Sequence, residues 1–181
     1  MVFFVEDLGG PAGSWAIFAA VNLASMVLIQ RYWGRLADIF GQKSVMMASG
    51  VGIVALPLMW WAASNTWFPF VIHIFNGLFW GGDNLAAFNL LLEVTPDDNR
   101  TVYVGVYNTL MGVATAAGPL IGGFAAEVLG LRPIFLISAV LRGLTLYLFW
   151  RNVTNTSERR MRFGDLLPKN RYRNMENLPG A

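Results

Sequence analysis

Two ionisable side chains stand near the middle of long apolar runs. Asp83 lies within residues 67–93, and Arg142 lies within residues 133–150. An isolated charge in hydrocarbon is costly, so charged residues there are expected to have a partner. Because both residues are near the centres of their runs, we expect them at similar depth and predict that they pair. Asp83 could then bind and release a proton or ion. The alternatives are a purely structural pair, or an Arg142 side chain that extends toward the membrane surface.

A stripe of polar side chains follows one face of the run at 67–93. At 100° per residue, these positions fall within an arc of about 100°. A polar stripe on a membrane helix must face protein or water, because its exposure to lipid is costly. We therefore predict that the stripe lines a solute cavity; the alternative is that its first members only bond neighbouring helices. The stripe contains His73, Asn76, Trp80, Asp83 and Asn84.

Other kinds of chemistry find no support in the residue types. The chain has no cysteine and a single histidine, His73. No serine has a histidine or acidic partner at catalytic spacing, and no glycine-rich phosphate loop with a lysine is present. We predict no enzymatic activity, no metal site and no cofactor. The pI near 9.2 does not indicate a nucleic-acid partner, because the basic residues are segregated into loops and the C-terminal segment.

The elements that must position these residues are membrane-spanning helices. The chain is 55% hydrophobic and 13% charged, whereas soluble domains average roughly 25% charged residues. Spanning a bilayer takes about 20 mostly apolar helical residues, and backbone groups in hydrocarbon must be satisfied within the segment. We therefore predict an all-α polytopic membrane protein, with a membrane domain over 1–150 and a cytoplasmic tail over 151–181. The five expected spans are 13–30, 44–64, 67–93, 101–128 and 133–150.

The distribution of lysine and arginine predicts the orientation. Cytoplasmic loops carry an excess of these residues. With five alternating spans, one side receives residues 31–43, Arg100 and the basic tail, whereas the other receives only Arg132. We therefore expect an external N-terminus, a cytoplasmic C-terminus and insertion in the plasma (inner) membrane. No cleavable signal peptide is expected.

Residues 34–43, here called the signature segment, lie between the first two spans. Their pattern G-x-L-A-D-x-x-G-x-K resembles the loop that joins the second and third helices of a six-helix half in the major facilitator superfamily of secondary transporters. Ile39 and Gln42 depart from the pattern, since the family usually has basic residues there. The resemblance implies a latch, in which Asp38 accepts hydrogen bonds at a helix N-terminus or pairs with an arginine; the alternative is a solvated connector. The matching residues are Gly34, Leu36, Ala37, Asp38, Gly41 and Lys43, and Arg35 is a candidate partner for Asp38 within the loop.

A second motif lies in the run at 101–128. Its spacing is similar to a motif in the fifth helix of antiporter-type members, with Ala114 replacing one glycine, and to segments in the eleventh helix of many members. Small residues let helix backbones approach closely, and Pro119 is expected to bend the helix. The motif predicts either helix packing or a bend used in gating. Its residues are Gly105, Gly118, Pro119, Gly122 and Gly123.

The resemblance also implies which part of a transporter the chain represents. The signature segment follows the first span here, so we predict five helices of an incomplete six-helix half, with residues 1–12 left from the preceding external loop. Arg142, the segment Tyr107–Thr109 and the tail without another apolar run favour the C-terminal half, helices eight to twelve. The alternative is helices two to six of a drug/proton antiporter. On the favoured assignment, the run at 67–93 is the tenth helix, which lines the central cavity.

The predicted function is secondary active transport of a small solute by alternating access, with proton coupling as one option. The expected partners are the solute, the lipid bilayer and the missing helices. The alternative is a non-transporting membrane scaffold or receptor on the same fold.

Overall fold

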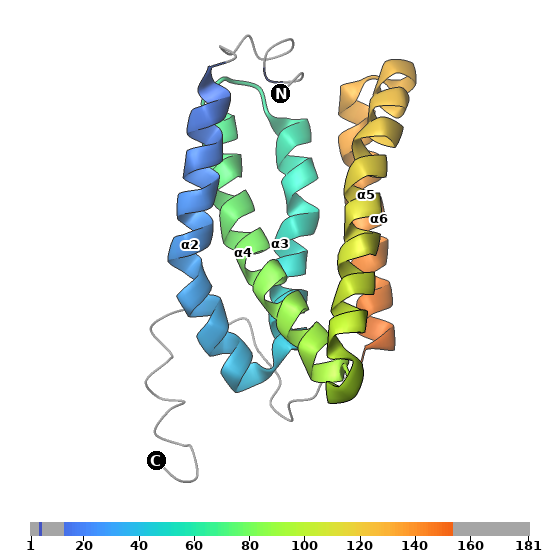
Figure 1. The fold of residues 1–181 in the computed structure, drawn as a ribbon. Coiled ribbons are helices and arrows are strands. Elements are labelled where there is room, and N and C mark those ends of the chain that lie inside the picture. The colour runs from blue at the N-terminus through green and yellow to red at the C-terminus, as the bar shows by residue number, and fades with distance from the viewer. Residues whose placement is uncertain (1–3, 5–12, 154–181) are drawn as a thin grey trace.

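The computed structural model describes residue 4 and residues 13–153. Nearly all of the predicted tail at 151–181, and all but one residue of the predicted loop remnant at 1–12, lie outside these described residues. Five long helices and one short 3₁₀ turn run up and down in sequence (Figure 1). They are α2 (Ser14–Phe40), α3 (Gln42–Ala62), α4 (Phe68–Val94), η1 (Asp97–Asn99), α5 (Arg100–Leu129) and α6 (Leu131–Asn152). The predicted all-α class is confirmed.

Two glycines form the shortest connections. Gly41 separates α2 from α3 with φ 82°, and Gly130 separates α5 from α6 with φ 80°. Both glycines lie in a backbone region that side-chain-bearing residues rarely adopt. The amide of each donates to the carbonyl four residues earlier, Ala37 and Ala126 respectively. Each connection therefore reverses the chain within a single residue.

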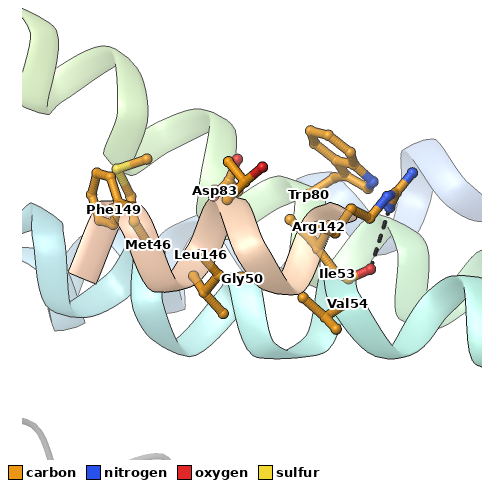
Figure 2. Close-up of a pocket in the computed structure, with 10 residues that line it drawn as sticks. Met46, Gly50, Ile53, Val54, Trp80, Asp83, Arg142, Leu146 and Phe149 are labelled. Carbon is orange, nitrogen blue, oxygen red and sulfur yellow. Dashed lines mark hydrogen bonds between the residues drawn. The ribbon is translucent and has the colours of Figure 1, made fainter. Parts of the chain in front are cut away.

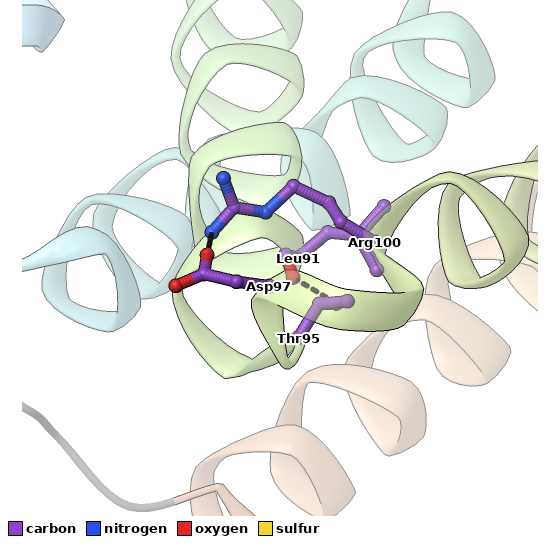
Figure 3. A network of polar contacts seen from close by, with 4 residues as sticks. All are labelled: Leu91, Thr95, Asp97 and Arg100. Carbon is purple, nitrogen blue, oxygen red and sulfur yellow. Dashed lines mark hydrogen bonds and ion pairs between the residues drawn. The ribbon is translucent and has the colours of Figure 1, made fainter.

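The connection between α4 and α5 is held by local polar contacts (Figure 3). The Thr95 hydroxyl donates to the carbonyl of Leu91 at 2.6 Å, at the end of α4. Arg100, at the start of α5, forms an ion pair with Asp97 at 2.6 Å. Both side chains of that pair are well exposed, so it contributes at most about 1 kcal/mol.

Four helices, α2, α3, α5 and α6, are long and apolar enough to cross a membrane. The fifth, α4, has the required length but is not among them, and it carries His73, Asn76 and Asp83 in its interior. It packs extensively against both α2 and α3, so protein shields much of its surface (Figure 1). The apolar run at 67–93 predicted a fifth span; α4 is not among the helices apolar enough to cross a membrane, so its place in the bundle is what supports that prediction.

Two clusters of buried side chains hold α2, α3 and α4 together. The first joins the end of α2 to α3 and α4, and the Trp33 indole within it donates to the carbonyl of Leu78 at 2.9 Å. It consists of Trp33, Leu36, Ala37, Phe40, Val45 and Ala86. The second consists of Ile53, Leu56, Ala63 and Ile72.

Close backbone approach occurs between α2 and α4. A Cβ added at Gly77 would lie 2.3 Å from the Asn22 carbonyl oxygen, and one at Gly82 would lie 2.7 Å from the Trp33 ring. Real Cβ atoms do not approach neighbours so closely, so glycine is required at both positions. Small residues that bring backbones together are a common device in membrane helix packing.

The outermost helix of the bundle is α5. It has no buried residue and packs mainly against α6 (Figure 1). Its large apolar side chains, among them Leu110, Ile121 and Phe124, are exposed. Within the described chain, α5 therefore lacks the partners that its apolar surface requires.

Candidate functional site

Asp83 and Arg142 line the same pocket, as their predicted depth suggested. The pocket has a volume of about 310 Å³ and lies between α3, α4 and α6 (Figure 2). Its α4 wall consists of Trp80 and Asp83, and Arg142 enters from α6. The remaining lining is mostly apolar: Met46, Gly50, Ile53, Val54, Thr145, Leu146 and Phe149.

The predicted ion pair between Asp83 and Arg142 is absent from this structure. Among the described residues, the one ion pair within 4 Å joins Arg100 to Asp97. Arg142 instead donates through Nη1 to the carbonyl oxygen of Ile53 at 3.2 Å. Figure 2 shows its guanidinium directed away from the Asp83 carboxylate. The pairing prediction was wrong because it overlooked a backbone acceptor on the neighbouring helix.

That acceptor follows from Pro57, which lies inside α3. In a regular helix, the amide of residue 57 would donate to the carbonyl of residue 53, but proline has no N–H. The Ile53 carbonyl therefore lacks this partner, and an unsatisfied carbonyl in an apolar interior is costly. Arg142 supplies the replacement donor. The sequence contained a signal for this contact: a proline within a predicted span leaves the carbonyl four residues earlier without its helical donor.

His73 lies in a different environment from Asp83. Its ring stacks on Phe18 with a centroid distance of 5.0 Å and meets Trp15 and Trp60 edge-on at 5.6 and 6.1 Å. Both ring nitrogens are buried and form no hydrogen bond with the described residues. His73 is therefore enclosed by aromatic rings from α2 and α3 and does not line the pocket.

Asn76 and Asn84, the other members of the polar stripe, also lie outside the pocket. The Asn76 amide donates to the Asn22 side chain on α2 at 3.0 Å, which is the bonding between neighbouring helices that the alternative reading expected. Asn84 is exposed. The structure therefore divides the stripe into three environments, and only Trp80 and Asp83 share a pocket. Solute contact by these residues remains a prediction.

Most of the signature segment is helical. Residues 34–40 form the last turns of α2, which extends well beyond the predicted span of 13–30, and Gly41 makes the turn. Three apolar residues of the segment, Leu36, Ala37 and Phe40, are buried. Together with Trp33 they follow the i, i+3, i+4, i+7 spacing of an amphipathic helix, a signal that could have predicted this continuation.

The polar residues of the signature segment do not form the contact expected for Asp38. Asp38 and Arg35 are exposed, and no ion pair joins them in the described chain. The segment's polar contact with another helix of the described chain is made by Lys43, whose ammonium group donates to the carbonyls of Trp150, at 3.0 Å, and Val153 at the end of α6. Gly34 is not tightly enclosed, since a Cβ there would meet Leu85 at an ordinary 3.7 Å.

The glycine motif of α5 meets no other helix in the described chain. Cβ atoms added at Gly105, Gly118, Gly122 or Gly123 would have no neighbour within 4 Å. The helix continues unbroken through Pro119. Sequence reasoning placed the small-residue packing here, whereas the close contacts are made by glycines of α3 and α4, among them Gly52, Gly77 and Gly82. The missed signal was the run Gly77-x3-Gly81-Gly82 in the polar helix.

The chain is similar to known membrane transport proteins. The profile of the Major Facilitator Superfamily matches residues 1–175. The chain is 31% identical over 149 residues to the multi-drug resistance efflux pump PmrA of Streptococcus pneumoniae serotype 4, a match that covers 76% of the chain and 35% of the pump. It is 30% identical over 144 residues to the multidrug resistance protein MdtG of Dickeya zeae, covering 76% of the chain and 35% of that protein.

A further relative is the class B tetracycline resistance protein of Escherichia coli. It is 27% identical over 156 residues, and the match covers 84% of the chain and 38% of the relative. The chain thus spans between 35% and 38% of the length of these three proteins. These similarities agree with the prediction of a transport protein and not an enzyme.

Proposed function

The chain belongs to the major facilitator superfamily, and from this premise we propose that it forms the C-terminal half, helices eight to twelve, of a secondary transporter that moves a small solute by alternating access. Membership and the four apolar helices make it an integral membrane protein. Since the chain spans little more than a third of its relatives, transport would require further helices. In such folds, solute sites lie near the midplane between repeats.

The observation that carries this proposal is the pocket containing Trp80, Asp83 and Arg142. A scaffold helix has no need of unpaired charged groups in an apolar interior, where they are expensive. Here Asp83 accepts no hydrogen bond from the described residues, although it lines a pocket large enough for a small molecule. A carboxylate without a partner in an apolar interior does not stabilise the fold, so its presence favours a role in solute or ion binding.

We propose the same orientation that the basic residues predict, with the C-terminus in the cytoplasm and insertion in the inner membrane. Asp83 is the candidate for proton coupling, because it is the pocket's carboxylate and has no ion-pair partner within the described chain. The relatives' names provide the first solutes to test, tetracycline and other drugs exported from the cell.

The alternative assignment to helices two to six of a drug/proton antiporter is supported by one observation, the glycine motif of α5. Arg142 and the segment Tyr107–Thr109 favour the C-terminal half. Both assignments place the signature segment at the same relative position in a half. They differ in which half must be supplied to complete the transporter.

Two chimaeras of MdtG test both the function and the half. In one, the chain replaces helices eight to twelve; in the other, it replaces helices two to six. We expect drug export from energised cells by the first chimaera only, and loss of export by its Asp83→Asn variant. Export by the second alone would reverse the half assignment. If both chimaeras reach the membrane as monodisperse proteins and neither exports any relative's drug, the scaffold alternative is favoured instead.

A further inference from the structure

The pocket between α3, α4 and α6 contains one negative and one positive group that do not neutralise each other directly. The Asp83 carboxylate forms no ion pair within the described chain. Arg142 has five N–H donors, of which the recorded contact with Ile53 uses one, on Nη1. Both groups line the same 310 Å³ pocket. Each therefore has bonding capacity available to a molecule that enters.

The separation of these charges is built into the backbone. Pro57 removes the amide that would otherwise bond the Ile53 carbonyl, and the carbonyl then holds Arg142. Figure 2 shows this contact on the side of Trp80 that is away from Asp83. A guanidinium free to rotate would be drawn to a nearby carboxylate in a low-dielectric interior. Pro57 thus acts as a positioning residue for Arg142.

From this arrangement we infer that the pocket binds a small amphipathic zwitterion. Its ammonium group lies at the Asp83 carboxylate, where the Trp80 ring can contribute a cation–π contact. Its carboxylate or phosphate binds the free donors of Arg142, which suit planar anionic groups. Its apolar body lies against the aliphatic and aromatic lining. This inference names the solute class of the proposed transporter and rests on that proposal for its physiological meaning.

Ligands with a single charge fit the same pocket less well. An anion would satisfy Arg142 but would approach the unpaired Asp83 carboxylate, and a cation would have the converse problem. An uncharged ligand would displace water from both groups and replace neither set of hydrogen bonds, which is costly for charged side chains. Only a molecule with both charges compensates both groups.

Two sources could supply this chemistry, a free solute and the headgroup of a zwitterionic phospholipid. Binding assays on the purified 181-residue chain in nanodiscs distinguish them. The probe is tritium-labelled phenylalanine, with unlabelled phenylalanine, phenylalaninamide and N-acetylphenylalanine as competitors. These share an apolar body and carry, respectively, both charges, only the positive charge and only the negative charge. Nanodiscs of phosphatidylglycerol are compared with nanodiscs that also contain phosphatidylethanolamine.

In phosphatidylglycerol nanodiscs we expect phenylalanine to compete at concentrations about tenfold lower than either single-charge analogue, the factor that corresponds to one well-formed polar interaction. Asp83→Asn should abolish the preference over N-acetylphenylalanine, and Arg142→Gln the preference over phenylalaninamide. Each preference is a ratio of two competitor concentrations measured on the same variant, so a variant with a smaller folded fraction gives the same ratio. Thr115→Ala, on α5, exposed and outside the pocket lining, should change neither ratio. Val54→Phe should fill the pocket and remove all binding.

The outcomes separate clearly. If phosphatidylethanolamine suppresses phenylalanine binding in the wild-type chain but not in an Arg142→Gln protein that still binds, the occupant is a lipid headgroup; if it has no effect, the occupant is a soluble solute. Equal competition by all three compounds, or no saturable binding up to the solubility limit, overturns the inference. The binding assay does not depend on transport. Inactive MdtG chimaeras would therefore contradict the proposed transport function without contradicting zwitterion binding by the pocket.

Discussion

Lys43, in the first turn of α3, donates a hydrogen bond to the carbonyl of Trp150, near the end of α6, at 3.0 Å. It also donates to Val153. The last carbonyls of a helix have no intrahelical partner, and they carry the negative end of the helix dipole. Lys43 therefore provides both hydrogen bonds and charge to the end of a helix that is distant in sequence.

The first prediction is that Lys43→Met loosens α6 from α3. Loss of a charged donor at a partly exposed helix end should cost about 1 kcal/mol of unfolding free energy. The measurement is thermal unfolding of the purified chain in detergent, followed by circular dichroism. Arg151→Met is the matched control, because Arg151 lies in the last turn of α6 without a recorded side-chain bond. Equal losses in both variants would mean that Lys43 acts only through general charge.

The second prediction concerns Pro57→Ala. An alanine amide can donate to the Ile53 carbonyl, which releases Arg142 from it and lets Arg142 turn toward Asp83. Double-mutant cycles with Asp83→Asn and Arg142→Gln should show coupling near zero with proline present, since the two groups do not pair. With alanine at 57, we expect a coupling energy of about 1 kcal/mol or more, within the range for residues in contact.

Leu58→Ala is the control for this cycle, because Leu58 is the next residue of α3 but is exposed and retains its backbone donor. Strong coupling between Asp83 and Arg142 in the wild-type background would show that the two charges pair in solution, contrary to the structure.

The third prediction contrasts two glycines. Gly77→Ala places a Cβ 2.3 Å from the Asn22 carbonyl and 3.0 Å from the Met26 amide nitrogen. Both are backbone atoms that cannot turn aside, so we expect a loss of about 1–3 kcal/mol, as for overpacked cores. Gly118→Ala has no neighbour within 4 Å and should leave the stability of the isolated chain unchanged or slightly higher. Thermal unfolding of both variants in parallel provides the test.

The same Gly118→Ala variant should behave differently in an active chimaera. There, α5 would pack against the supplied helices, and an added methyl group at a close contact should reduce transport. Normal transport by this variant would show that the glycine face of α5 stays open in the complete protein.

The fourth prediction tests the orientation. The natural chain has no cysteine, so each introduced thiol reports alone. Ser64→Cys, between α3 and α4, should react with a membrane-impermeant maleimide in intact cells. Asp98→Cys, between α4 and α5, should react only after permeabilisation. Both side chains are exposed, so access to solvent does not bias the comparison. The reverse pattern would place the C-terminus outside.

The sequence predicted the helical elements better than their contacts. The length of the apolar runs was enough to predict the helices, and the glycine at position 41 indicated the turn after α2. The pairing of Asp83 with Arg142 failed because charge was treated without the backbone, although Pro57 was visible. The structure also does not bring His73 and Asp83 into one pocket, for another reason. Helical periodicity gives a residue's direction, whereas the neighbour it meets changes along a helix that crosses two others, so the aromatic rings around His73 could not be foreseen.

The single-residue turn at Gly41 has a mechanical consequence. With only one non-helical residue, tilting α2 must displace the first turn of α3, and Lys43 in that turn is attached to the end of α6. These three helix ends form a linkage in which a push on the exposed Asp38 side of α2 is transmitted to α6 without passing through the pocket. A turn of the same length at Gly130 joins α5 to α6, but among the described residues no side-chain hydrogen bond joins α5 to α2, α3 or α4. We therefore expect the ends of α2, α3 and α6 to move together when α2 tilts.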